Sequence, residues 1–123
     1  MRHMGTRVAK FDKRLLGSWK SDRRATFQHF VPNPVADPIA IRKLKTMYGK
    51  LCIRWGRGKC FTDLEGVKRI EGYELVARDS QSVVVRIFDE LTQEHRLIQI
   101  HFEGQYYWLW AWGMREFFRR VQS

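Results

Sequence analysis

Apolar and polar residues alternate with a period of two along most of the second half of the chain. Leu51, Ile53 and Trp55 alternate with Cys52 and Arg54, and the same pattern returns several times before the C-terminus. Such alternation predicts strands, because successive side chains of a strand point to opposite faces. The strands predicted in this way cover residues 15–21, 51–55, 59–64, 67–79, 83–88, 96–102, 107–112 and 115–121, with Gly72 as a bulge or bend.

The early part of the chain is predicted to contain a helix as well as extended structure. Residues 25–30 predict a second extended segment, and a helix is predicted over 38–48. Asp37 is a good N-cap and Pro38 suits the first helical position, where no amide donor is needed. Gly49 suits the C-terminal end, where a left-handed conformation is common. The apolar residues of this helix that share one face are Ile41, Leu44 and Tyr48.

Eight strands joined by short turns predict a mainly β fold with one short helix after the first strand region. A closed, up-and-down antiparallel barrel is the favoured architecture, because closure removes exposed sheet edges. The 123 residues suit one domain, which we expect over 13–123 after a flexible basic arm at 1–12. The five Trp, four Tyr and eight Phe favour strands, and aromatic residues also line pockets.

Charge and cysteine content indicate which partners and which cellular compartment to expect. The formal net charge is +10, and residues 38–62 hold seven Lys or Arg with no Asp or Glu. Such a charge attracts nucleic acid and anionic surfaces. The N-terminus lacks the apolar core of a signal peptide and no apolar run is long enough to span a bilayer, so we expect a cytoplasmic protein. Cys52 and Cys60 flank a turn, and we expect two reduced thiols rather than a disulfide.

The two ends of the chain resemble those of small bacterial lipocalin-like domains, members of the calycin group. Residues 15–20 hold Gly17-Ser18-Trp19, which resembles the G-x-W signature of the first strand, and residues 115–121 resemble the closing strand. The resemblance implies a barrel in which Arg119 or Arg120 covers the ring of Trp19 by a cation–π contact. These four residues would then be structural: Gly17, Trp19, Arg119 and Arg120.

Two groups of residues are candidates for ligand binding. Trp108, Trp110 and Trp112 share one face of a strand, where they either line a cavity and stack on a planar ligand or pack as core with one exposed aromatic face. The second group would place polar side chains inside a calyx, with an arginine to bind a carboxylate or phosphate. Its members are Arg54, Tyr73, Gln99 and His101; alternatively Arg54 faces solvent and His101 is an ordinary strand residue.

No pattern of catalytic residues stands out. The chain has no nucleophile elbow, glycine-rich phosphate loop or HExxH helix, so we expect no enzyme, no cofactor and no metal site. The favoured function is binding of a small apolar or anionic ligand in the mouth of the barrel. One alternative is a basic face that binds nucleic acid or an acidic partner, and another is an interaction domain whose barrel is filled by its own side chains.

Overall fold

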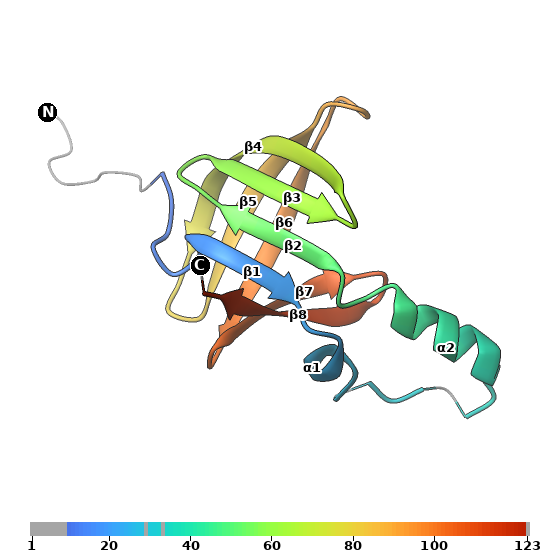
Figure 1. Ribbon diagram of the computed structural model, residues 1–123. Helices are drawn as coiled ribbons and strands as arrows, with labels where there is room; N and C mark the ends of the chain where they lie inside the picture. The colour runs from blue at the N-terminus through green and yellow to red at the C-terminus, as the bar shows by residue number, and fades with distance from the viewer. Residues whose placement is uncertain (1–9, 29, 33, 123) are drawn as a thin grey trace, which may run out of the picture.

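The eight strands close into a single antiparallel barrel (Figure 1), as the alternation pattern predicts. The computed structural model describes residues 10–28, 30–32 and 34–122. Each strand pairs with its neighbours in the sequence, and the last strand pairs with the first, so the sheet has no free edge. The strands are β1 (Gly17–Ser21), β2 (Leu51–Trp55), β3 (Lys59–Leu64), β4 (Val67–Arg78), β5 (Ser82–Asp89), β6 (Glu94–Glu103), β7 (Tyr106–Ala111) and β8 (Met114–Val121).

Among the residues that the structure describes between β1 and β2, two helices are found, not one. The segment expected to be extended at 25–30 is instead the short helix α1 (Arg23–Gln28). That prediction is wrong because Asp22 caps a helix here: its carboxylate accepts a hydrogen bond from the amide of Ala25 at 3.0 Å. The helix then packs on β8, where the hydroxyl of Thr26 accepts a bond from the amide of Phe117 at 3.0 Å.

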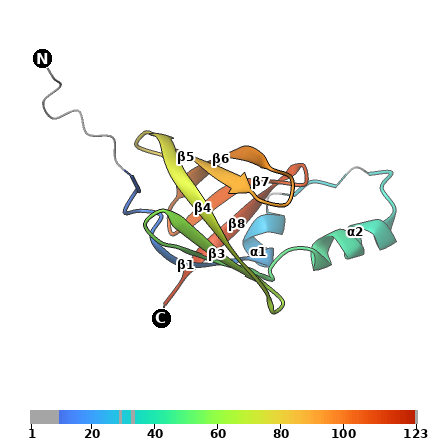
Figure 2. The same cartoon turned by 90° about the horizontal axis from the view of Figure 1, so that it is seen from above.

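The second helix, α2 (Pro38–Thr46), lies where the sequence predicts it. The Asp37 carboxylate accepts from the amide of Ile39 at 2.9 Å, and Gly49 has a φ of 90°. The helix ends two residues before the predicted boundary, and none of its residues is buried. Figures 1 and 2 show it projecting from the barrel, attached through the chain at each end. The amphipathic pattern therefore correctly predicts a helix, but the apolar face of this helix is not buried against the barrel.

Aromatic rings occupy the centre of the barrel. The rings of Trp19 and Tyr107 have centroids 4.6 Å apart, and Phe118 stacks on Tyr107 at a centroid distance of 4.9 Å. Trp55 donates its indole N–H to the Tyr107 hydroxyl at 3.0 Å and meets Tyr73 edge-on at 5.0 Å. These five rings form one continuous chain of contacts through the interior, and the barrel is filled there by its own side chains.

One end of the barrel is closed by the residues of the G-x-W region. The guanidinium of Arg120 lies 4.3 Å from the centre of the Trp19 ring and donates to the carbonyls of Leu16 and Arg14 at 2.7 and 2.9 Å. Gly17 has a φ of 115°, and a Cβ built on it would lie 2.7 Å from Arg120 Nη1. Glycine is therefore required both for the backbone conformation and to leave space for the Arg120 guanidinium.

Three further predictions have structural outcomes. The strand irregularity in β4 falls between Leu75 and Ala77, so Gly72 is not a bulge; it pairs in regular register with Lys59. Both cysteines are free, with Cys52 on the outside and Cys60 inside, where burial raises the thiol pKa to about 12. Of the arm expected at 1–12, residues 1–9 lie outside the described part.

Candidate functional site

The residues proposed to share one calyx do not meet inside the barrel. Tyr73 does point inward, and its hydroxyl donates to the Gly56 carbonyl at 2.5 Å. Arg54 lies on the outside, with its guanidinium 3.9 Å from the centre of the Phe61 ring. The alternation itself explains this result: Ile53 and Trp55 fill the core, so the residue between them must face outward. The alternative for Arg54, a solvent-facing side chain, is the one observed.

Gln99 and His101 are also on the outer face, because Ile98 and Ile100 pack in or against the core. The expected inward orientation of this pair is therefore wrong. A single strand cannot reveal which of its two faces is buried when both carry bulky residues. In β6 the neighbouring strands decide, since Val83 pairs with Ile100 and both are fully buried.

Four of the predicted site residues lie on the outer face of two adjacent strands, and three of them are in ring contact. His101 of β6 pairs in register with Trp108 of β7, and their rings stack at 3.9 Å with an 8° angle between planes. Trp110 meets Trp108 edge-on, with centroids 5.9 Å apart and planes at 88°. Gln99 is exposed two residues before His101 on the same face of β6. We call this set, together with Arg115, the outer aromatic face.

Arg115, which is not among the predicted site residues, completes the outer aromatic face from β8. It pairs in register with Trp110, and its guanidinium lies 5.2 Å from the centre of the Trp108 ring. The signal was present in the sequence, because a two-residue turn at Trp112-Gly113 aligns residue 115 with residue 110. The half-buried Trp108 ring thus stacks on an imidazole and lies near a guanidinium.

Two tryptophans at this side of the barrel remain largely exposed. Trp110 is 63% exposed and Trp112 is 67% exposed, whereas Trp19 and Trp55 are each 3% exposed. Trp112 sits in the β7–β8 turn with a φ of 52°, a left-handed conformation that is rare for a bulky residue. Contact of the apolar indole surface with water is unfavourable, so exposed tryptophans of this kind are typical of binding surfaces.

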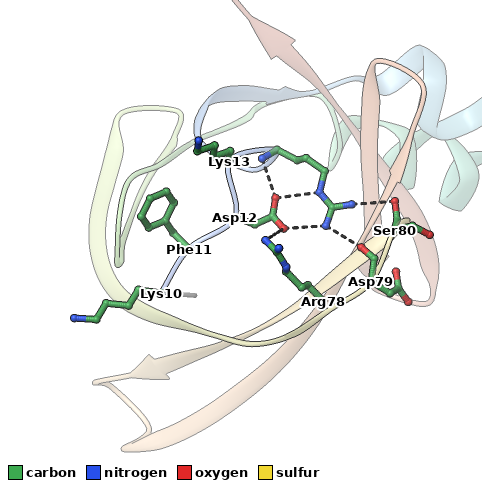
Figure 3. Close-up of a pocket in the computed structure, with 8 residues that line it drawn as sticks. Lys10, Phe11, Asp12, Lys13, Arg78, Asp79 and Ser80 are labelled. Atoms are coloured by element: carbon green, nitrogen blue, oxygen red, sulfur yellow. Dashed lines mark hydrogen bonds and ion pairs between the residues drawn. The ribbon is translucent and has the colours of Figure 1, made fainter. Parts of the chain in front are cut away.

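A separate hollow of about 790 Å³ lies at the closed end of the barrel (Figure 3). The Asp12 carboxylate, 3% exposed, lies in it and pairs with Arg14 at 2.8 Å and Arg78 at 3.4 Å. The hydrogen bond from Arg14 lowers the pKa of Asp12, against the effect of burial. Arg14 also donates to the carbonyls of Asp79 and Ser80 at 2.9 and 3.0 Å. These contacts tie the N-terminal segment to the β4–β5 turn, so the hollow serves the fold.

Other kinds of site find little support among the described residues. No three His, Cys, Asp or Glu side chains converge there in a way that could hold a metal ion. The buried Glu116 carboxylate accepts from the Ser21 hydroxyl at 2.6 Å, and burial raises its pKa against the effect of that bond. Neither helix in this part of the chain is long and apolar enough to cross a membrane. The outer aromatic face is therefore the strongest candidate for a binding site.

Comparison with known proteins adds no identity to this geometry. No family model, no curated protein and no solved structure matches the chain. The function must therefore be argued from the side chains of the outer aromatic face and from the charge around it.

Proposed function

We propose that this protein is a non-catalytic module that binds single-stranded nucleic acid on the outer aromatic face. The observation that carries the proposal is the exposed ring of Trp110, held edge-on against Trp108 and flanked in register by Arg115. A base would stack on the Trp110 indole, and the guanidinium would meet a phosphate. Stacking on exposed aromatic rings beside cationic residues is the common way that proteins bind single strands.

The charge of the chain supports an anionic polymer over a neutral planar ligand. The sequence carries 23 Lys or Arg against 13 Asp or Glu. Between residues 23 and 62 there are nine cations, while the single acidic residue, Asp37, caps α2. A field of this sign concentrates polyanions at the surface and speeds their association.

A small apolar or anionic ligand inside the barrel is the weaker proposal. The contact chain of Tyr73, Trp55, Tyr107, Trp19 and Phe118 occupies the centre where such a ligand would lie. The resemblance to lipocalin-like domains concerns the two ends of the chain, and a shared barrel would not carry ligand transport with it. A cytoplasmic location, where nucleic acid is accessible, belongs to the same proposal.

The test is fluorescence anisotropy with a labelled oligodeoxythymidine of about 12 nucleotides, comparing wild type with Trp110→Ala. Loss of one base–aromatic stack of about 1–3 kcal/mol predicts affinity roughly 5- to 150-fold weaker. Ile70→Ala is the matched control, since Ile70 is 64% exposed on β4 and should leave affinity unchanged. The control separates loss of stacking from loss of any exposed apolar side chain.

Two results would contradict the proposal. The first is equal affinity of wild type and Trp110→Ala for the oligonucleotide. The second is absence of oligonucleotide binding together with binding to vesicles of anionic phospholipid, which would assign the exposed tryptophans to a membrane surface instead.

A further inference from the structure

A cationic surface borders the outer aromatic face beside α1. It is an open pocket of about 1000 Å³ between α1, the end of α2 and the first residue of β7. Arg23 and Arg24 of α1 and Lys45 of α2 line it, and all three side chains are exposed. We call this surface the α1 pocket.

The charge of the α1 pocket is strongly positive. Asp22 is the one acidic residue among the described residues that line it, and its carboxylate is already engaged. It accepts from the amide of Ala25 at 3.0 Å and pairs with Arg119 at 3.8 Å. Lys45 has its Nζ 5.8 Å from the centre of the Phe27 ring, so an aromatic wall holds this ammonium group over the pocket.

The α1 pocket is continuous with the outer aromatic face through Tyr106. Tyr106 lines the pocket, and its ring meets Phe117 edge-on at 6.1 Å. Phe117 in turn lies 6.3 Å from Trp108, centroid to centroid. Tyr106, Trp108 and Trp110 share the outer face of β7, so the first and last of them are about 13 Å apart along the strand. A few nucleotides of an extended strand would span that distance.

We infer that the α1 pocket binds the phosphates of the same nucleic acid strand whose bases stack on the outer aromatic face, an inference that rests on the proposed function. The strand runs along β7 from Trp110 past Tyr106 and enters the pocket. Arg24 and Lys45 contact its phosphates there. Arg23 has a structural task as well, because its Nε donates to the Tyr48 carbonyl at 3.1 Å.

The experiment measures the dependence of affinity on salt for two lengths of oligodeoxythymidine, a dinucleotide, which is too short to reach from Trp110 to the pocket, and a strand of about 12 nucleotides. Each phosphate contact on a single strand contributes about 0.7 to the slope of log K against log salt. The double variant Arg24→Gln/Lys45→Gln should reduce that slope by about 1.4 for the longer strand and leave the shorter one unchanged. Arg23 is kept so that the contact with Tyr48 is not disturbed.

The matched control is Arg57→Gln/Lys59→Gln, which removes the same charge from exposed positions in and beside the β2–β3 turn. It should leave both slopes at the wild-type value, because these residues lie off the strand path. An equal reduction in both double variants would show a general effect of net charge and overturn the assignment of the pocket. So would an unchanged slope in Arg24→Gln/Lys45→Gln.

Two more arms separate this inference from the proposed function and from a free anion. Trp110→Ala should weaken both lengths without changing the slope. If Trp110→Ala has no effect, the stacking proposal is wrong, while the slope of Arg24→Gln/Lys45→Gln still reports on the pocket. Titration with inorganic pyrophosphate should give no saturable binding. Saturable binding that the double variant abolishes would make the pocket a site for a free anion, not a polymer backbone.

Discussion

Replacement of Tyr107 by Phe tests whether the interior of the barrel is dry. The Tyr107 side chain is fully buried, and its hydroxyl accepts the indole N–H of Trp55 at 3.0 Å. The variant keeps the ring and removes only the acceptor, so the Trp55 N–H is left buried with its bond broken. Leaving a buried donor without a partner costs about 1–3 kcal/mol. For a chain of this length, each kcal/mol lowers Tm by about 4 °C.

The assay is urea unfolding of wild type, Tyr107→Phe and the control Tyr106→Phe. Tyr106 lies half-exposed on the outer face, so its hydroxyl can exchange partners with water, and its loss should cost less than about 0.5 kcal/mol. The slope with denaturant should be the same for all three proteins, since each loses the same buried surface on unfolding. If Tyr107→Phe were as stable as wild type, the interior would not be dry, because water beside Trp55 would then have to accept the indole N–H.

Three further predictions concern the fold. Arg120→Ala should lower the free energy of unfolding by about 1–2 kcal/mol, because it removes the contact with Trp19 and two hydrogen bonds. Arg119→Ala breaks only an exposed ion pair and should cost less than about 0.5 kcal/mol. Thermal unfolding measures both variants. Glu116 has a folded pKa raised by burial, so its ionisation destabilises the fold as pH rises through that pKa. Glu116→Gln should therefore be more stable than wild type at pH 7, with the advantage lost in acid below the pKa of the unfolded chain; an advantage that persists there would contradict this. Leu44→Ser should change stability by less than about 1 kcal/mol, because α2 buries no residue; a larger loss would show that the helix packs on the barrel.

Much of the fold could be predicted because strands leave a simple record in the sequence. The alternation around Ile53 and Trp55 places both in the core. The Asp37 cap locates the start of α2, and the helix ends two residues before the predicted boundary. Helix α1 escaped prediction because it is only six residues long, too short to show a period. Its start depends on a single capping bond from Asp22.

The candidate site was harder to predict for a physical reason. Both faces of β6 and β7 carry bulky side chains, so alternation gives the grouping of residues but not the side that is buried. Alternation correctly groups Gln99 with His101 and Trp108 with Trp110 by face along their own strands. The prediction that the β6 pair faces inward is wrong. Pairing with β5 settles which side faces inward, and that information is not local to β6.

Binding on the outer aromatic face is tested most directly with the five indole N–H signals of the tryptophans as reporters in a ¹H–¹⁵N spectrum. Oligodeoxythymidine is titrated into the labelled protein, with signals assigned by single Trp→Phe variants. Binding on the outer aromatic face predicts saturable shifts of the Trp108 and Trp110 signals, while the signals of the buried Trp19 and Trp55 stay in place. Shifts confined to Trp19 and Trp55, or no shift at any indole, would contradict the claim that this barrel binds through its outer aromatic face.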